Sequence, residues 1–193
     1  RIDVTSSAPQ QLINYEHPTY NFDVIDGVNY QIDVTQPAKF GPDCELLNAT
    51  ASRIVNLSYT DNSGNVVSGK ALAEKQFIVA TNNYRAFGGS FAGTGSEHVV
   101  MELPDSNREA LVSYIGQQSG YDAASGQYRG QVNPAADNNW RLLPVAGSAV
   151  LDIRFSTQDS KTAEDFVRRY KQWPMTKLGT DELGFAQYRI ELQ

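Results

Sequence analysis

Residues 80–89 (ATNNYRAFGG) bring an aromatic ring, amides and two glycines together in one short stretch. The stretch follows a short apolar run that predicts a buried strand, and loops at strand ends are where binding residues concentrate. Tyr84 can stack on a purine, and the neighbouring Asn83 can hydrogen-bond a base edge or a sugar. Gly88 and Gly89 allow a close approach of the backbone to a ligand. An aromatic ring beside a glycine pair also occurs as simple packing, so the pattern alone leaves both interpretations open.

A phosphate-binding loop and a calcium loop are each matched only in part. Residues 64–70 (GNVVSGK) fit most of the P-loop pattern, but Ala71 stands where a Ser or Thr hydroxyl would hold magnesium. Residues 61–65 (DNSGN) open like a calcium loop, yet Val66 and Leu72 occupy the positions that need Gly and Glu. Both stretches are therefore interpreted as turn chemistry in a hairpin loop.

A serine nucleophile and a metal centre are also disfavoured. Residues 88–92 (GGSFA) lack the last glycine of the Gly-x-Ser-x-Gly elbow, which in addition needs a base. The sequence has two histidines: His17 precedes a proline, and His98 lies in a predicted strand. These two and the one cysteine are far apart and show no zinc-ligand spacing. No metal ion is expected in this chain.

Composition and charge exclude several classes of partner. The 193 residues are enough for one compact domain, and 40% hydrophobic with 20% charged residues is close to a soluble globular average. The net charge of −6 and the lack of a basic stripe argue against a polymeric nucleic acid, although a single nucleotide remains acceptable. The apolar runs are too short to span a bilayer. Because the chain starts at Arg1 without a signal peptide, we interpret it as a piece of a longer protein.

Hydrophobic periodicity predicts more strands than helices. The predicted strands are 20–35 (a hairpin turning at Asp26-Gly27), 53–59, 76–81, 97–103, 151–155 and 185–192. The predicted helices are 106–118 and 160–170, with a turn region at 60–68 and a long loop at 119–139. This order of elements favours an α+β fold with a mixed or mostly antiparallel sheet.

Several of these stretches resemble one enzyme family when they are taken together and in order. Residues 20–37 (YNFDVIDGVNYQIDVTQP), 77–89 (FIVATNNYRAFGG), 135–142 (AADNNWRL), 151–155 (LDIRF) and 173–175 (WPM) carry the likeness. They resemble the carboxy-terminal region of the bifunctional 2′,3′-cyclic phosphodiesterase/3′-nucleotidases of the 5′-nucleotidase superfamily. The likeness runs from about residue 11 to the end of the chain.

The resemblance implies a division of labour within a longer protein. Residues 1–193 would form part of a carboxy-terminal substrate-binding domain with the mixed sheet layers of that superfamily. An amino-terminal metallophosphatase domain, outside this chain, would hold two divalent metal ions that activate water. The isolated chain would then be inactive, the protein periplasmic, and its ligands nucleotides such as 3′-AMP and 2′,3′-cyclic AMP.

The resemblance also implies roles for particular residues. Family members hold the base between two aromatic rings; Tyr84 matches one, and the other would precede Arg1. The lone Cys44 matches a family position whose disulfide partner would also lie upstream, although the residues alone fit a small apolar side chain equally well. One departure is that residues 88–91 read GGSF rather than Gly-Gly-Asp-Gly. The residue that grips the ribose is therefore left open.

Two other interpretations remain open from the residues. Ten tyrosines, two tryptophans and many Asn and Gly residues are compatible with a non-enzymatic module that binds carbohydrate or a surface. Alternatively, the segments from residue 119 onward only support the interface with the missing domain. Trp140 is expected in the core or at that interface, because large aromatic side chains are usually buried.

Overall fold

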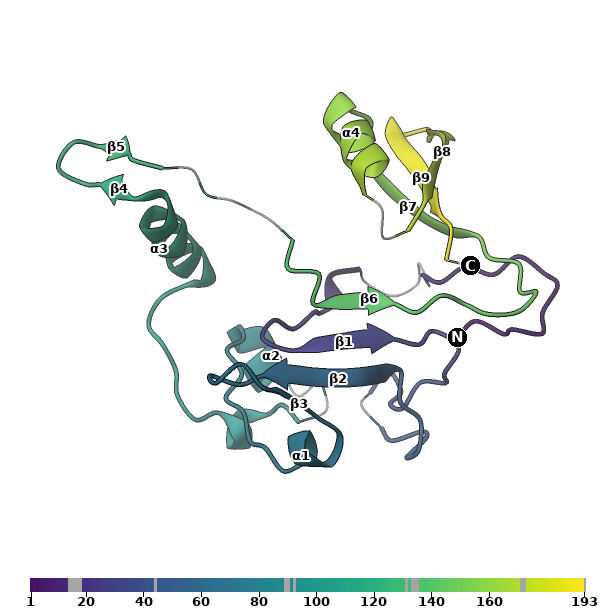
Figure 1. Ribbon diagram of the computed structural model, residues 1–193, viewed down its shortest axis with the longest axis horizontal. Helices are drawn as coiled ribbons and strands as arrows, with labels where there is room; N and C mark the ends of the chain where they lie inside the picture. Colours follow the sequence, from purple (N-terminus) through teal and green to yellow (C-terminus); the bar gives the residue numbers. More distant parts are fainter. Residues whose placement is uncertain are drawn as a thin grey trace. The chain divides into compact units, whose positions relative to one another are not determined.

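The computed structural model describes residues 1–13, 19–43, 45–88, 91, 93–130, 132, 136–170 and 173–192. The chain forms two compact units (Figure 1). Unit 1 comprises Arg1–Gly41, Leu46–Lys75 and Asn139–Gln193, and unit 2 comprises Pro42–Glu45 and Gln76–Asn138. Strands and helices occur in mixed order, which confirms the α+β class. The finer expectation, the layered fold of the 5′-nucleotidase superfamily, stays a prediction.

A four-stranded mixed sheet lies in unit 1. Its strands are β1 (Asn29–Ile32), β2 (Ile54–Thr60), β3 (Val66–Ser68) and β6 (Trp140–Leu142), in the order β3-β2-β1-β6. β2 pairs antiparallel with both β1 and β3, whereas β1 pairs parallel with β6. The turn between β2 and β3 is held by the Asp61 carboxylate, which accepts hydrogen bonds from the amides of Ser63 and Asn65, both at 2.9 Å. A short helix, α1 (Gly69–Ala73), follows β3.

A second, three-stranded antiparallel sheet in unit 1 carries the helix α4. It contains β7 (Ile153–Gln158), β8 (Met175–Thr180) and β9 (Phe185–Ile190) in the order β7-β9-β8, and α4 (Lys161–Arg169) connects β7 to β8. The Ser160 hydroxyl caps α4 by accepting a hydrogen bond from the amide of Ala163. Phe155 on β7 stacks on Tyr188 of the central strand, with ring centroids 5.4 Å apart. The helix predicted at 160–170 is thus confirmed, and it ends at Arg169.

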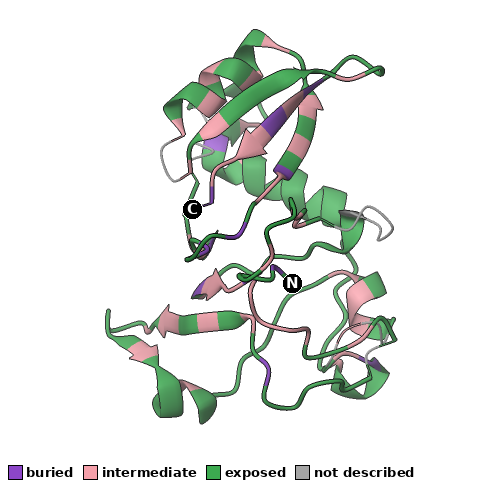
Figure 2. Cartoon of the chain, turned by 90° about the vertical axis from the view of Figure 1, so that its right-hand side faces the viewer, coloured by how far each residue is buried: buried purple, intermediate pink, exposed green. Residues whose placement is uncertain are grey.

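The core of unit 1 joins segments from both ends of the chain. Its buried members are Ile2, Val34, Leu142, Val145, Ala149, Ile153 and Leu192 (Figure 2 shows the buried residues in purple). Backbone hydrogen bonds tie the same segments together: Ile2 donates to Val34 and Val145 donates to Leu192, each at 2.8 Å. The core therefore depends on residues from the first and the last few positions of the chain.

Unit 2 has little regular sheet. It contains α2 (Asn83–Phe87), the 3₁₀ helix η2 (Ser96–His98), α3 (Asn107–Ser119) and a short hairpin of β4 (Tyr121–Asp122) and β5 (Gln127–Tyr128). α3 starts with a capping box, in which the Glu109 amide donates to the Ser106 hydroxyl and the Ser106 amide donates back to the Glu109 carboxylate. It ends at Gly120, whose φ of 62° is a left-handed conformation suited to glycine. The helix predicted at 106–118 is therefore confirmed as well.

The predicted hairpin over residues 20–35 is wrong. Only its second arm forms a strand, β1, while the first arm begins with a 3₁₀ helix, η1 (Thr19–Asn21). Asp26 and Gly27 do turn the chain, with Gly27 at φ 82°. Both edges of β1 are taken by β2 and β6, so no edge is left for the first arm.

The strands predicted at 76–81 and 97–103 are also wrong. Among the described residues neither segment pairs with a strand, and residues 96–98 form η2 instead. The expected burial of 76–81 fails too, because Ile78 is 83% exposed. A pattern of apolar residues predicts which side chains are buried. A strand also requires a neighbouring backbone to which its amide and carbonyl groups can hydrogen-bond.

Other boundaries shift in smaller ways. Part of the predicted turn at 60–68 is β3, and the predicted loop at 119–139 contains the β4–β5 hairpin. β8 was not predicted, and it brings a bulge at Lys177 and Gly179. The strand expected at 151–155 begins at Ile153, and β9 ends at Ile190 rather than residue 192.

We expect Tyr188→Phe to stabilise the protein by about 1 kcal/mol. Tyr188 is 2% exposed, and its hydroxyl has no hydrogen-bond partner among the described residues. A buried hydroxyl without a partner costs roughly 1–3 kcal/mol of desolvation free energy. Urea unfolding measures the change, and Tyr30→Phe is the matched control, because the Tyr30 hydroxyl accepts a hydrogen bond from the Ile25 amide. A loss of stability in Tyr188→Phe would show that its hydroxyl is paired.

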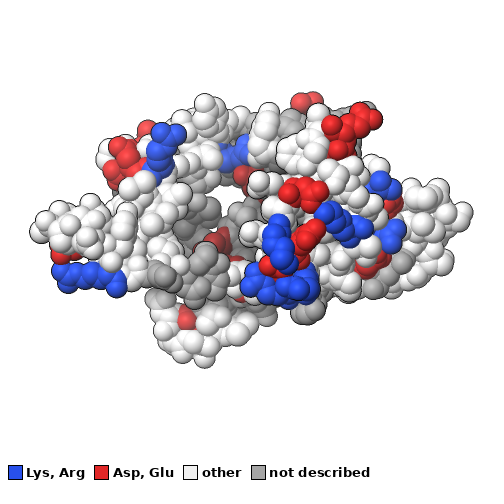
Figure 3. Space-filling model, turned by 90° about the horizontal axis from the view of Figure 1, so that it is seen from above, with Lys and Arg blue, Asp and Glu red and all other residues white. Residues whose placement is uncertain are grey.

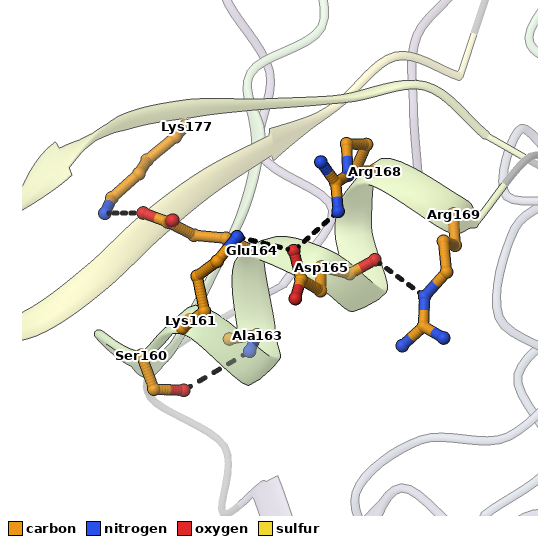
Figure 4. A network of polar contacts seen from close by, with 8 residues as sticks. All are labelled: Ser160, Lys161, Ala163, Glu164, Asp165, Arg168, Arg169 and Lys177. Carbon is orange, nitrogen blue, oxygen red and sulfur yellow. Dashed lines mark hydrogen bonds and ion pairs between the residues drawn. The ribbon is translucent and has the colours of Figure 1, made fainter.

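An ion-pair network joins α4 to β8 and predicts a pH dependence (Figure 4 shows the contacts around α4). The Lys177 ammonium lies 2.7 Å from Asp159 and 3.0 Å from Glu164. Hydrogen bonds from Lys177 and then Thr180 lower the pKa of Asp159, and Asp159 and Glu164 raise the pKa of Lys177.

Lys177→Met should therefore lower the melting temperature near neutral pH. A carboxylate with a lowered pKa stabilises the fold above its ordinary pKa of about 3.9, and this contribution is lost as pH falls through the folded-state value. The gap in melting temperature between the two proteins should accordingly close in acid. Thermal unfolding followed by circular dichroism from pH 2 to 8 tests this. Lys70→Met is the control; a gap that does not depend on pH would argue against the network.

Candidate site on helix α2

Tyr84 lies in the first turn of α2 and is 79% exposed. The side-chain oxygen of Asn82 caps this helix by accepting a hydrogen bond from the amide of Arg85 at 3.0 Å. At the other end, the amide of Gly88 donates to the carbonyl of Tyr84 at 3.1 Å. The ring therefore stands on a short, capped turn of helix with most of its surface open to solvent.

The other predicted site residues lie on the same turn, as far as the structure describes them. Asn83 and Gly88 are both exposed, next to and one turn after Tyr84. Gly88 has a φ of −69°, so it serves as the end of the helix and makes no use of the left-handed freedom of glycine. Gly89 and Ser90 lie outside the described residues. Three of the four predicted residues thus share one surface segment.

A contact between Arg85 and Phe91, which the sequence analysis did not predict, covers one side of α2. The Arg85 guanidinium lies over the ring of Phe91, 4.6 Å from its centroid, which is a cation–π contact. The following loop returns to the helix, because the amide of Gly95 donates to the carbonyl of Ala86 at 2.9 Å. No local pattern in the sequence indicated this contact, because residues 80–89 were interpreted as a loop. Together these contacts leave Asn83 and Tyr84 as the solvent side of the segment.

Within the described residues, no group of three His, Cys, Asp or Glu side chains gathers as it would around a metal ion. His98 lies in η2 rather than in a strand, and its Nε2 is 3.6 Å from the carboxylate of the neighbouring Glu97. The exposed Tyr84 ring and the exposed Asn83 side-chain amide have the chemistry for stacking on, and hydrogen bonding with, a flat polar ligand.

Trp140 belongs to unit 1 and is only partly exposed. It opens β6 and packs edge to face against Phe22, with ring centroids 5.8 Å apart. The side-chain amide of the neighbouring Asn139 donates hydrogen bonds to the backbone carbonyls of Ile25 and Val28, at 2.7 and 2.9 Å. Trp140 thus packs within its own unit without being a member of the buried core, and its expected place at an interface stays a prediction. Cys44 lies outside the described residues.

The chain is similar along its whole length to known nucleotide phosphoesterases. It is 47% identical over 193 residues to the 2′,3′-cyclic-nucleotide 2′-phosphodiesterase/3′-nucleotidases of Haemophilus influenzae and Salmonella typhimurium. It is also 43% identical over 193 residues to the trifunctional nucleotide phosphoesterase protein YfkN of Bacillus subtilis. The chain spans 27% and 28% of the length of the first two relatives and 12% of the third.

These matches show that the chain is a region of a protein of the nucleotide phosphoesterase class. More particularly, the chain belongs to the 2′,3′-cyclic-nucleotide 2′-phosphodiesterase/3′-nucleotidase family, as a carboxy-terminal region of it. The resemblance seen in the sequence is thereby confirmed. No protein-family model matches the chain, and no solved structure matches it. In the part of the chain that the structure describes, no helix has the length and apolar character needed to cross a membrane.

The cap on α2 can be tested directly. Asn82→Ala removes the acceptor for the Arg85 amide, and losing such a cap costs about 1 kcal/mol of helix stability. We expect hydrogen exchange at the amides of Arg85 and Ala86 to become about fivefold faster. Asn82→Asp keeps an acceptor at the same place and should leave the exchange rates close to those of the unsubstituted protein. Equal rates in all three proteins would mean that α2 does not depend on this cap.

Proposed function

We propose that this chain is the nucleotide-recognition portion of a phosphoesterase that hydrolyses 2′,3′-cyclic nucleotides and 3′-nucleotides. The observation that carries the proposal is the match of the entire chain, at 47% identity, to enzymes named for these activities. A high exposure of Tyr84 is compatible with it, since a ring that stacks on a base has to be reachable from solvent.

In this proposal the residues of α2 bind and orient, and they take no part in bond breaking. Tyr84 lies flat against the nucleobase, and Asn83 hydrogen-bonds a base edge or the ribose. The exposed Gly88, followed by Gly89, lets the ligand come close to the backbone. Two divalent metal ions in the amino-terminal domain of the longer, periplasmic protein supply the activated water. The 193-residue chain alone is accordingly expected to hydrolyse nothing.

The charge distribution supports a single small nucleotide rather than a polymer as the ligand. On the face seen in Figure 3, blue Lys and Arg side chains lie next to red Asp and Glu side chains. On α4, for example, Asp165 pairs with Lys161 at 2.9 Å and with Arg168 at 2.7 Å. Cations that are already paired offer little to a phosphate backbone, whose binding rests on the release of counterions.

Tyr84→Ala in the longer enzyme should raise KM for 3′-AMP by roughly 5- to 150-fold. This range corresponds to the loss of about 1–3 kcal/mol of base stacking. KM for a simple phenyl phosphate ester, which has no base, should change little, and Tyr84→Phe should keep most of the affinity. Steady-state kinetics on both substrates provides the measurement.

Tyr20→Ala is the matched control, because Tyr20 is 77% exposed and lies in unit 1. It should leave KM for 3′-AMP unchanged. If Tyr84→Ala also leaves KM unchanged, Tyr84 is not part of the site. Titration with adenosine and with simple sugars separates the alternative, since binding of sugars without nucleosides would identify a carbohydrate-binding module.

A further inference from the structure

The turn at Asp26 and Gly27 holds a carboxylate against the next backbone amide. Oδ1 of Asp26 accepts a hydrogen bond from the Gly27 amide at 2.7 Å, and both residues are exposed. Gly27 lies at φ 82°, and no other atom stands within 4 Å of the place that a Cβ would take there. Glycine has no side chain that could hinder an approach to its own nitrogen. The contact therefore places a carboxyl carbon beside an accessible backbone nitrogen.

The Asp-Ser pairs of the chain differ from this turn in how their reacting groups are bound. Asp-Gly occurs once in the sequence, and Asp-Ser occurs at residues 105–106 and 159–160. The amide of Ser106 donates to the carboxylate of Glu109 at 2.8 Å. The carboxylate of Asp159 accepts hydrogen bonds from Lys177 and Thr180, at 2.7 and 2.8 Å. In each Asp-Ser pair, one of the two groups is thus bound to a different partner.

We propose that Asp26 is a site of spontaneous isomerisation to isoaspartate. The Gly27 nitrogen attacks Cγ of the protonated Asp26 carboxyl group, and the new N–Cγ bond closes a succinimide ring. The carboxyl hydroxyl leaves as water together with the amide proton. Water then opens the ring: cleavage of the N–Cγ bond restores aspartate, whereas cleavage of the bond from the nitrogen to the backbone carbonyl carbon gives isoaspartate. Since one water leaves and one returns, the mass is unchanged.

The reaction would weaken a contact that anchors β6. The side-chain amide of Asn139 bridges the carbonyls of Ile25 and Val28, one on each side of the turn, at 2.7 and 2.9 Å. In isoaspartate the backbone runs through Cβ and Cγ, which lengthens the chain between these two carbonyls by one carbon atom. One amide group can then no longer bridge both carbonyls, so Asn139 is released. The inference does not depend on what Tyr84 binds.

Ageing of the longer protein at mildly acidic pH tests the proposal. An isoaspartate-specific methyltransferase with labelled S-adenosylmethionine marks isoaspartyl carboxylates, and mass spectrometry of peptides locates them. We expect label at residue 26, in a peptide whose mass before labelling is unchanged, and none at Asp105 or Asp159. An absence of label at residue 26, or equal label at all three positions, would overturn the proposal.

Two substitutions at the same position are matched controls. Asp26→Glu keeps the charge but has a side chain too long to close a succinimide, so the label at this position should be lost. Asp26→Asn forms the same ring with loss of ammonia, so it should be labelled and should gain the mass difference between an amide and an acid. Label at position 26 in the aged Asp26→Glu protein would show that the succinimide route is wrong.

Hydrogen exchange measures the release of Asn139 independently of the label. The amide of Tyr30 donates to the backbone carbonyl of Asn139 at 2.9 Å. In the aged protein this amide should exchange about fivefold faster than in fresh protein, because the side-chain hydrogen bonds of Asn139 are lost. The melting temperature should fall by several degrees, whereas ageing should change neither quantity in Asp26→Glu. Equal exchange at Tyr30 in labelled and fresh protein would contradict the proposed release.

Discussion

The parallel pairing of β1 with β6 is the contact on which the arrangement of the chain depends. Tyr30 lies opposite Trp140 and Ile32 opposite Leu142, and the amide of Tyr30 donates to the carbonyl of Asn139 at 2.9 Å. The Asn139 side chain also holds the carbonyl of Val28, 111 residues earlier in the chain. Closing a loop of this length costs on the order of 4 kcal/mol of chain entropy. The burial of Leu142 in the core of unit 1 helps to offset that cost.

Most of unit 2, Gln76–Asn138, lies in the sequence between α1 and β6 of unit 1. Unit 1 has a core and two sheets, whereas unit 2 is held by short local contacts such as the cap of α2 and the capping box of α3. A unit built in this way can present residues without contributing to the main core. The candidate nucleotide-binding turn belongs to unit 2, whereas Trp140 packs on Phe22 within unit 1.

The candidate site depends on which side of α2 is covered by other residues of the chain. Arg85 is drawn toward Phe91, and the loop behind it bonds back to Ala86, so the exposed side of the helix belongs to Asn83 and Tyr84. This cation–π contact holds the Arg85 side chain, and Tyr84 beside it stays exposed. Stacking on a base requires an open ring face, and in the proposed function the bond-breaking chemistry is left to metal ions elsewhere in the protein.

The amino-acid sequence by itself determined the features that rest on local chemistry or on similarity. Both longer helices could be predicted, because Ser106 with Glu109 and Ser160 are caps that act within one turn. The enzyme family and the position of Tyr84 on a short motif were also readable from the order of the residues. Strand β2 and the start of β9 were readable from their alternation of side chains.

Only the tertiary structure decided which strands pair. Residues 20–35 contain a strong turn signal, yet β6, more than a hundred residues away, takes the edge that a hairpin would need. Residues 76–81 have the composition of a buried strand, but among the described residues they form no strand of any sheet. Apolar periodicity is a property of one segment, whereas a backbone partner is a property of two. The Arg85–Phe91 contact and the exposure of Tyr84 beside it were likewise decided by the tertiary structure, because no local pattern predicts them.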